Sequence, residues 1–372
     1  MINVGITGQA GFVGTHLFNF LRLEPEQFNL VPFEDDYYKD SETLNQWVSK
    51  CDAIVHLAAL NRHNDPDTIY NTNVELVKQL IVALEETQST PHILFSSSTQ
   101  EEFDNPYGRS KKVGRELLVD WAKRNGALFT GLVIPNVFGP FGNPYYNSVV
   151  ATFSHQITHG EQTRIDVDKL MKLIYVGELV EVIRHCIVEG ISSPAHEVPH
   201  TSELKVTELL EILEGYHSTY TENGMIPSLN NEFERNLFNT FRGYMNIPEH
   251  YPVMLKEHTD DRGSFVETMH LGIGGQVSFS TTKPGITRGN HYHTRKIERF
   301  VVIKGKALIQ LRRIGTEEVI NFELDGKNPS YVDMPVWYTH NITNTGSDDL
   351  FTLFWINEFY DPDDPDTFYE TV

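Results

Sequence analysis

The chain has 372 residues, 40% hydrophobic and 11% aromatic, a composition typical of a folded protein with room for two full-sized domains. A formal charge of −21 and an isoelectric point near 5.1 argue against a surface for nucleic acid or anionic membranes, and we expect neither partner. Two cysteines, Cys51 and Cys186, give no disulfide framework. No secretion signal and no apolar run of about 18 residues is seen, so we expect a cytoplasmic protein.

The first 130 residues or so alternate short apolar runs with segments of helical periodicity. The expected strands are 2–6, 29–33, 53–57, 92–96 and 128–134, and the expected helices are 11–23, 70–86 and 107–124. This alternation predicts βαβ units and a doubly wound parallel sheet of the Rossmann type. A strand at 173–176 and helical patterns at 177–188, 203–214 and 228–242 follow.

The pattern of apolar and turn-forming residues in the sequence changes after residues 247–252. Short alternating strands separated by Gly, Pro, Asn and Asp dominate from there to residue 372. That spacing is typical of an antiparallel barrel or sandwich. We therefore expect an α/β domain over residues 1–247 and an all-β domain over 248–372.

A glycine-rich turn follows the first expected strand. In the run Thr7 to Gly14, Gly8 permits a tight turn, Gly11 lets the backbone approach a pyrophosphate, and Gly14 allows close packing of helix and strand. The amino terminus of the following helix would offer N–H donors to phosphate. Glycine-rich turns are common, but the strand–turn–helix context favours a dinucleotide site.

A second group of polar residues lies at the end of the fourth strand and the start of the next helix. Ser98 ends the strand, while Tyr107 and Lys111 are four apart and share a helix face. An ammonium beside a phenol would stabilise the phenolate and lower its pKa, and Ser98 would polarise a substrate carbonyl. The structural alternative is a helix-start tyrosine followed by a solvated lysine.

The residues that would meet the adenosine end of a dinucleotide are acidic. Glu34, Asp35 and Asp36 follow the second strand, where an acid bonds a ribose diol and repels a 2′-phosphate. This chemistry favours NAD. Arg62 and Lys39 are the nearby cations whose position the sequence does not fix.

Three histidines and a glutamate in the β-rich half could meet at one point: His291, His293 and Glu298 form one cluster, and His340 follows about forty residues later. On a strand, His291 and His293 point to one face, and Glu298 and His340 can reach the same point from neighbouring strands. Three imidazoles and one carboxylate suit zinc, iron, manganese or nickel. The alternative is a pair of surface histidines on a strand.

The glycine turn, Ser98 and the Tyr107–Lys111 pair together resemble the extended short-chain dehydrogenase/reductase family. Further matches are the run His56 to Ala59 and the run Pro135 to Gly139. The resemblance implies catalysis by Ser98, Tyr107 and Lys111, and a sugar nucleotide near Asn136. It also implies cofactor contacts from Thr7, Gly8, Gly11, Phe12, Val13, Gly14, Leu57, Ala58, Tyr107 and Lys111. We interpret His56 as a buried, hydrogen-bonded residue at a strand end.

The second half resembles the cupin family, a jelly-roll β-barrel. The match covers Gly285, the cluster from His291 to Glu298, Gly305, and the run Pro335 to Asn344. One departure is Trp337, where that family usually has glycine. The resemblance implies a metal centre at His291, His293, Glu298 and His340, although some cupins use a histidine as a base instead.

The whole chain resembles the CapF-type bifunctional capsular polysaccharide enzymes of the UDP-N-acetyl-L-fucosamine pathway. Supporting stretches include Asn147 to Phe153, Asp260 to Phe265 and Lys283 to His291. The resemblance implies that the cupin inverts C3 of a UDP-4-keto-2-acetamido-2,6-dideoxy-hexose. The reductase half then reduces C4 to give UDP-2-acetamido-2,6-dideoxy-L-talose. It also implies NADP as cofactor, zinc as metal, a homodimer, and substrate contacts from Asn136, Asn147 and Arg288.

Two alternatives remain open for the β domain. The runs Arg262 to Phe265 and Arg288 to His291 resemble sugar-nucleotide 3,5-epimerases, which use a histidine base without metal; here the base would be His291. The β domain could also be a binding or dimerisation module beside a lone sugar-nucleotide reductase.

Overall fold

The computed structural model describes residues 1–261 and 263–372, and for residues 263–265 it describes the backbone alone. The Arg262 motif therefore lies outside the described side chains. The chain forms two compact units, which are residues 1–149 with 169–205, and residues 150–168 with 206–372. Residues 206–247 therefore belong to the same compact unit as the β domain, whereas the sequence pattern predicted a domain boundary at residue 247.

The first unit is built on a six-stranded parallel sheet with the order β2-β1-β3-β4-β5-β8. Its strands are β1 (Ile2–Thr7), β2 (Phe28–Val31), β3 (Ala53–His56), β4 (His92–Ser98), β5 (Phe129–Ile134) and β8 (Ser193–Glu197). The expected Rossmann-type parallel sheet is confirmed. The order reverses between β1 and β3, which defines the topological switch point of the sheet.

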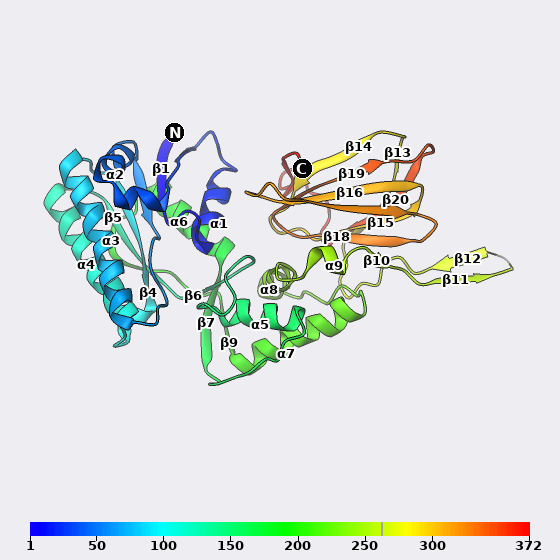
Figure 1. Ribbon diagram of the computed structural model, residues 1–372, viewed down its shortest axis with the longest axis horizontal. Helices are drawn as coiled ribbons and strands as arrows, with labels where there is room; N and C mark the ends of the chain where they lie inside the picture. The colour runs from blue at the N-terminus through cyan, green and yellow to red at the C-terminus, as the bar shows by residue number, and fades with distance from the viewer. Residues whose placement is uncertain (262) are drawn as a thin grey trace. The chain divides into compact units, whose positions relative to one another are not determined.

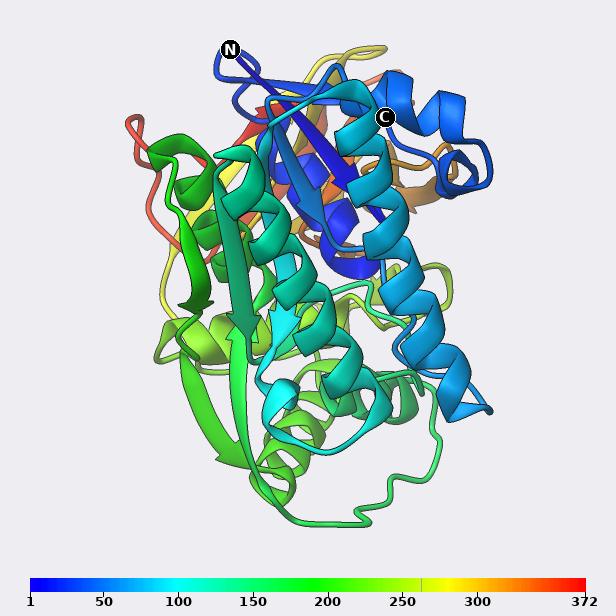
Figure 2. The same cartoon turned by 90° about the vertical axis from the view of Figure 1, so that its left-hand side faces the viewer.

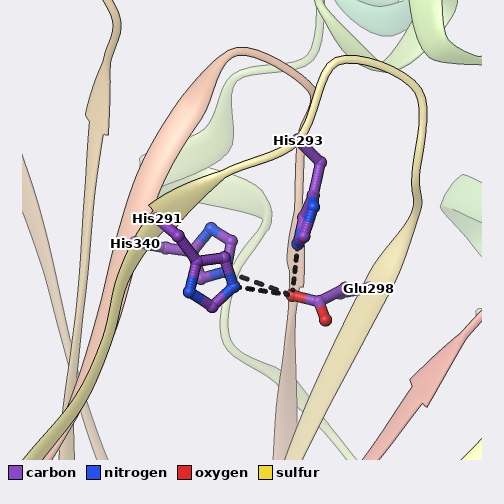
Figure 3. A group of neighbouring side chains, drawn as sticks. All are labelled: His291, His293, Glu298 and His340. Atoms are coloured by element: carbon purple, nitrogen blue, oxygen red, sulfur yellow. Dashed lines mark ion pairs between the residues drawn. The ribbon is translucent and has the colours of Figure 1, made fainter. Parts of the chain in front are cut away.

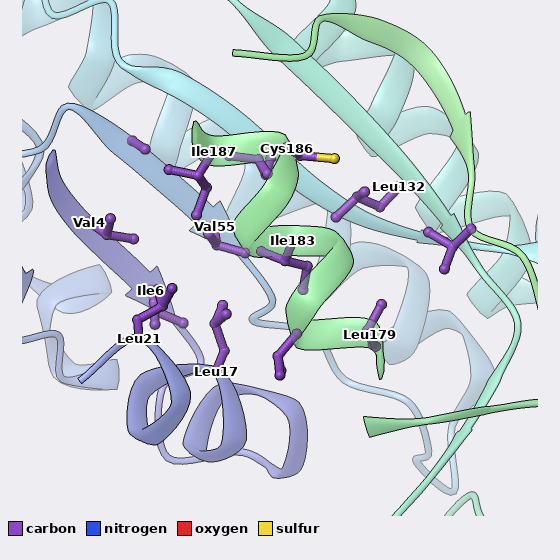
Figure 4. Packing of buried hydrophobic residues seen from close by; sticks show 14 of the residues in the cluster. Val4, Ile6, Leu17, Leu21, Val55, Leu132, Leu179, Ile183, Cys186 and Ile187 are labelled. Carbon is purple, nitrogen blue, oxygen red and sulfur yellow. The ribbon is translucent and has the colours of Figure 1, made fainter. Parts of the chain in front are cut away.

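Helices cover both faces of this sheet (Figure 1). On one face lie α2 (Ser41–Val48), α3 (Pro66–Thr87) and α4 (Pro106–Asn125), and on the other lie α1 (Phe12–Leu21) and α6 (Val176–Glu189). Figure 2 shows α3 and α4 packed side by side in front of the strands. Buried apolar side chains fill each side: Trp47, Leu80 and Trp121 belong to one cluster. Leu17, Leu21 and Ile183 belong to the other, shown in Figure 4.

A small three-stranded sheet completes the first unit, with the order β6-β7-β9. Its strands are β6 (Asn136–Phe138), β7 (Leu170–Tyr175) and β9 (Ser202–Lys205). The sequence predicted a helix from residue 203, but residues 202–205 pair with β7, with Leu204 opposite Met171. Only from Val206 does helix α7 (Val206–Tyr216) begin. Strand pairing here overrides a short helical pattern, because both Leu204 and Met171 are buried by it.

The second unit contains two five-stranded antiparallel sheets, of order β10-β18-β15-β20-β13 and β17-β16-β19-β14-β21. Their strands are β10 (Val253–Met254), β13 (Gln276–Thr282), β14 (Thr287–Tyr292), β15 (Glu298–Lys304), β16 (Lys306–Arg313), β17 (Val319–Asp325), β18 (Ser330–Met334), β19 (Tyr338–Asn344), β20 (Leu350–Ile356) and β21 (Phe368–Tyr369). A separate hairpin pairs β11 (Glu257–Asp260) with β12 (Gly263–Val266). Apolar residues from both sheets share one core, so the expected all-β domain is confirmed.

The helices of the second unit are α5 (Val149–Thr158), α7, α8 (Glu232–Arg242) and α9 (Ile247–His250), with a π-helical turn over His217–Glu222. Polar contacts join them to the β domain. The Tyr220 hydroxyl donates to Asp333 Oδ2 at 2.6 Å, and Arg242 Nη2 donates to the Met334 carbonyl at 3.1 Å. These buried contacts explain why residues 206–247 group with the sheets. Within the described residues, no helix is both long and apolar enough to cross a membrane.

Candidate functional site

The carboxyl ends of β1 and β3 meet at the switch point of the first sheet, where ligands bind in open α/β folds. Thr7 ends β1 and His56 ends β3, and their Oγ1 and Nδ1 atoms lie 2.9 Å apart. The Ala58 N–H also donates to Thr7 Oγ1 at 3.3 Å, and the Tyr38 hydroxyl lies 3.3 Å from His56 Nδ1. Burial, aided by the charge of Lys111, lowers the pKa of His56 to about 3. These contacts are those of a buried, hydrogen-bonded strand-end residue.

The glycine turn packs tightly between this strand end and helix α1. Gly8 has φ of +67°, and a Cβ added there would lie 2.9 Å from Ala58 Cα. A Cβ on Gly14 would lie 2.2 Å from the Gly8 carbonyl oxygen, so α1 can approach the turn only without a side chain. Gly11 is exposed and caps α1, whose first N–H groups can therefore meet a phosphate.

The remaining residues expected to contact the cofactor lie around the same turn. Phe12 and Val13 form the half-buried start of α1, and Leu57 and Ala58 follow directly after β3. The Leu57 N–H donates to the Thr7 carbonyl at 3.3 Å. The structure thus brings the two segments together at the carboxyl edge of the sheet.

Helix α4 presents Tyr107 and Lys111 next to strand β4. The helix begins at Pro106, and the Asn105 side chain accepts from the Gly108 N–H at 2.8 Å, which fixes Tyr107 in the first turn. One turn later the Lys111 ammonium lies 5.6 Å from the centre of the Tyr107 ring. Ser98, at the end of β4, accepts from the Gln100 N–H at 3.2 Å.

Sequence reasoning missed Ser96, which is the direct partner of the buried lysine. Lys111 Nζ donates to Ser96 Oγ at 3.3 Å, and Ser96 Oγ donates to the His56 carbonyl at 3.1 Å. Alternation along β4 puts Ser96 on the same face as Ser98, and this pattern was the available signal.

The electrostatics around Tyr107 differ from the expectation that Lys111 lowers the phenol pKa. In the chain alone, burial raises the pKa of Tyr107, and the nearby Tyr146 adds to this. Burial also lowers the pKa of Lys111 to about 7, opposed by the charge of Glu101. The reason is desolvation, which disfavours both the phenolate and the ammonium before any ligand is bound.

The two cations that could neutralise a 2′-phosphate already have partners in the first unit. Lys39 forms an exposed ion pair with Asp36 at 2.6 Å. Arg62 Nη1 donates to the carbonyls of Tyr145 and Tyr146 at 2.6 and 3.3 Å. Arg62 therefore holds the 145–146 loop, a role that the sequence could not show.

The three residues expected to contact substrate are all exposed. Asn136 lies on β6, and its Nδ2 donates to the Lys172 carbonyl at 3.2 Å. Asn147 lies in the loop before α5. Arg288, in the second unit, lies on β14 three residues before His291 and donates to the Thr281 carbonyl at 3.2 Å.

The predicted cluster in the β domain comes together at one point (Figure 3). His291 ends β14 with Tyr292, His293 follows it, Glu298 begins β15 and His340 lies on β19. The Nε2 atoms of His293 and His340 are each 3.1 Å from Glu298 Oε2, and that of His291 is 3.9 Å away. One ligand atom from each residue lies within 4.8 Å of the others, so the four can share a metal ion.

The outer ring nitrogens show how the histidines are oriented. His340 Nδ1 lies 3.2 Å from the Tyr338 carbonyl, and His293 Nδ1 contacts the Asp366 carbonyl. A carbonyl can only accept, so each Nδ1 carries a proton, and in the neutral form of each ring Nε2 presents a lone pair. These two Nε2 atoms and Glu298 Oε2 are buried without hydrogen-bond partners among the described residues. Three converging acceptors fit a cation.

The pKa directions also indicate that the cluster attracts positive charge. Burial acts to lower the pKa of His293, but the adjacent Glu298 outweighs it and raises that pKa. Burial acts to raise the pKa of Glu298, but the histidines, first His293, hold it well below its usual value. The same electrostatics would favour a proton or a metal ion at this point.

Trp337, the departure from the cupin pattern, adopts the conformation that glycine favours. Its φ is +62°. Its backbone N–H donates to the His293 carbonyl at 2.8 Å, and its indole stacks on Tyr292 with ring centres 5.7 Å apart. Packing and hydrogen bonding thus hold a strained tryptophan, at a cost on the order of 1–3 kcal/mol.

Fold and sites define a two-part protein, with a nucleotide-binding α/β unit of the dehydrogenase type joined to an antiparallel β domain. Residues 4–197 match the NAD dependent epimerase/dehydratase family, and residues 258–368 match the polysaccharide biosynthesis C-terminal domain. The chain is 32% identical over 370 residues to UDP-2-acetamido-2,6-beta-L-arabino-hexul-4-ose reductase from Pseudomonas aeruginosa, covering 99% of this chain and 98% of that protein.

Solved structures agree with this assignment. The capsular polysaccharide assembling protein CapF from Staphylococcus aureus is 34% identical, with a TM-score of 0.63 and complete coverage of both chains. RMD from Pseudomonas aeruginosa, solved with NADPH, shares the fold over 59% of this chain and 83% of its own, at 23% identity and a TM-score of 0.53. The chain therefore belongs to the NAD dependent epimerase/dehydratase family, in the two-domain group that includes CapF and the Pseudomonas reductase.

Proposed function

We propose that the chain is a bifunctional sugar-nucleotide enzyme. The β domain inverts C3 of a UDP-4-keto-2-acetamido-2,6-dideoxy-hexose, and the α/β unit then reduces C4 with NADPH to give UDP-2-acetamido-2,6-dideoxy-L-talose for capsule or O-antigen synthesis. The observation that carries this proposal is the convergence of His293, Glu298 and His340 on one buried point, in a chain that also carries the Tyr107–Lys111 pair. Full-length similarity to a named 4-keto sugar reductase supports the reductase half.

Reduction would take place at the switch point of the first sheet. The glycine turn would hold the pyrophosphate of a nicotinamide dinucleotide, whose bound nicotinamide would supply the hydride for the C4 carbon. Tyr107 would give its hydroxyl proton to the C4 oxygen, and Ser98 would hydrogen-bond that oxygen. Lys111 would favour the phenolate that remains, provided that ligand binding keeps its ammonium charged. The resemblance to CapF-type enzymes favours NADPH, whereas the acids at 34–36 favour NADH.

Inversion at C3 depends on the ketone at C4. The ketone acidifies the C3 proton, so a base can remove it to form an enolate, and reprotonation from the other face inverts the centre. His291, His293, Glu298 and His340 would hold a divalent cation, most readily zinc, which supplies a Lewis acid for the ketone oxygen. Reduction removes the ketone, so inversion must come first. We further propose functional domains of 1–247 and 248–372, and a homodimer.

A second candidate mechanism uses His291 as a base without metal. Its side chain is 23% exposed, against 4% for His293 and 0% for His340, and its Nε2 lies farther from Glu298 than theirs do. A ligand entering the cluster would therefore meet His291 before the other two. In a third candidate the β domain is a binding or dimerisation module and the chain is a reductase alone.

Incubation with a 4-keto sugar nucleotide in deuterated water separates these functions. We expect deuterium at C3 without cofactor, and oxidation of NADPH once it is added. Exchange that survives complete metal removal would favour the His291 base. Cofactor oxidation with no C3 exchange under any condition would leave only the reductase.

A further inference from the structure

Asp366 lies outside the four-residue cluster, yet it contacts both His293 and the loop that follows it. Its backbone carbonyl accepts from His293 Nδ1. Its carboxylate accepts from the N–H and hydroxyl of Thr294, at 3.0 and 2.7 Å, through Oδ1. Through Oδ2 it accepts from the N–H groups of Arg295 and Lys296, at 3.0 and 2.9 Å. Asp366 is only 3% exposed, so water competes little for these bonds.

These contacts constrain the spacing of the cluster as well as one ring. Residues 294–296 belong to the short connection between His293 and Glu298. Three successive N–H groups in that connection point at one carboxylate, which is the arrangement of a backbone anion nest. Bonds to an ionised acceptor are stronger than neutral ones. Asp366 therefore fixes the ring orientation of His293 and the backbone that leads to Glu298.

The segment that carries Asp366 is itself anchored to the β domain. Strand β21 pairs with β14, so that Tyr369 lies opposite His291. The Arg312 guanidinium donates to the Glu370 carboxylate at 3.0 Å and to the Thr371 carbonyl at 2.6 Å. Asp366 has φ of +38°, a left-handed conformation that a residue other than glycine keeps only when its surroundings hold it. Residues 294–296 are therefore bonded to a residue whose own segment is fixed to strand β14 through β21.

We infer that Asp366 is a positioning residue for the cluster, holding His293 and the 294–296 connection so that His293 Nε2 and Glu298 meet a divalent cation at one point. This inference rests on the proposed function of the cluster as a cation site. The backbone carbonyl of Asp366 holds the His293 ring, and its carboxylate holds the backbone between His293 and Glu298. Loss of a residue that hydrogen-bonds around the ligands of a metal commonly lowers metal affinity by about 10- to 100-fold.

The full chain carrying Asp366→Asn tests the inference. An amide keeps the size of the side chain but offers one acceptor oxygen where the carboxylate offers two. Either the Thr294 N–H or the N–H groups of Arg295 and Lys296 therefore lose their acceptor. We expect the affinity for Zn²⁺, measured by competition with a chromophoric chelator, to fall by about 10- to 100-fold. We also expect the visible absorption of bound Co²⁺ to change, because the ligand geometry changes.

Asp364→Asn is the matched control. Asp364 lies in the same segment and pairs with Arg295 at 2.8 Å, but its side chain is 67% exposed. Its replacement should leave Zn²⁺ affinity within about twofold of the unmodified chain, because an exposed ion pair contributes little. Thr294→Val removes one of the four carboxylate bonds and should weaken Zn²⁺ binding by about tenfold, because a hydrogen bond to a charged group contributes about 1.5 kcal/mol or more.

The outcomes separate this inference from the proposed function. If Asp366→Asn binds Zn²⁺ as the unmodified chain does, with an unchanged Co²⁺ spectrum, Asp366 is not a positioning residue. If Asp366→Asn does not fold, Thr294→Val decides in the same way. If the unmodified chain binds neither metal, the cation site fails, and the role of Asp366 fails with it.

Discussion

Arg299 and Asp333 form a bidentate ion pair across strands β15 and β18, with Nε–Oδ1 and Nη2–Oδ2 distances of 2.7 and 2.9 Å. Their side chains are 1% and 0% exposed. Tyr220 also donates to Asp333, so the ion pair links the helical residues 206–247 to the β domain. Burial acts to raise the pKa of Asp333, but Arg299 keeps it below its usual value.

Asp333→Asn should therefore destabilise the protein strongly. It leaves the charge of Arg299 buried without its carboxylate partner and removes the negative charge that acts on the buried Arg242, and we expect the free energy of unfolding to fall by about 3–5 kcal/mol. Chemical denaturation would measure this. Asp104→Asn, which breaks an ion pair with side chains 54% and 87% exposed, should cost less than about 1 kcal/mol. An equal loss of unfolding free energy in the two variants would show that the buried ion pair contributes no more to stability than the exposed one.

Tyr107→Phe should abolish cofactor oxidation and leave deuterium exchange at C3 intact. The change removes only the hydroxyl proposed to protonate the C4 oxygen, and a general acid commonly contributes about 10²- to 10⁴-fold to a rate. Spectrophotometry of NADPH and NMR of the sugar give the two rates. Arg109→Lys, an exposed change on the same helix, serves as control. Loss of both activities in a folded Tyr107→Phe protein would argue against two independent sites.

The purified protein should contain one divalent metal per chain, with zinc expected. Elemental analysis measures it directly, and replacement of the deeply buried His340 by Gln should abolish it, because an amide oxygen is a much poorer ligand for zinc than an imidazole nitrogen. His92→Gln is a control at another buried histidine, which hydrogen-bonds Thr130 at 2.8 Å. An active, folded protein with less than about a tenth of an equivalent of any transition metal would rule out the metal mechanism.

NADPH should be the preferred cofactor, as the resemblance to CapF-type enzymes implies. Comparison of kcat/KM for NADPH and NADH tests this, and Asp36→Asn is informative because it frees Lys39 from its ion pair. We expect Asp36→Asn to increase the preference for NADPH, since a negative charge near a 2′-phosphate is removed. A strong preference for NADH would show that the acids at 34–36 were the better guide.

Inversion should precede reduction, and Glu298→Gln in the full chain tests the order. Without a working β domain, the substrate should give either no alcohol or an alcohol with uninverted C3, whereas the unmodified chain should give the inverted alcohol. Coupling constants in the NMR spectrum of the product distinguish them. A fragment ending at 247 is less suitable, because Tyr220 and Arg242 make their contacts with the β domain. An inverted alcohol from the Glu298→Gln protein would contradict the assignment of C3 inversion to the β domain.

The sequence by itself determined the parts of this protein that follow from local rules. Alternation and helical periodicity located the strands β1 to β5 and the helices α1, α3 and α4, because they reflect which side of each element is buried. The spacing of Gly8 and Gly14, and of His291 and His293, was likewise readable, because turn geometry and strand pleat act over a few residues.

The tertiary structure alone decided what depends on residues far apart in the chain. Desolvation, and not the neighbouring ammonium, governs the pKa of Tyr107 in the chain alone, because burial is a property of the assembled fold. Three further contacts also exist only in the assembled fold. Lys111 donates to Ser96, Tyr220 donates to Asp333, and His293 contacts the carbonyl of Asp366, 73 residues away in the chain. No local pattern records these contacts, since each forms only when separate elements pack.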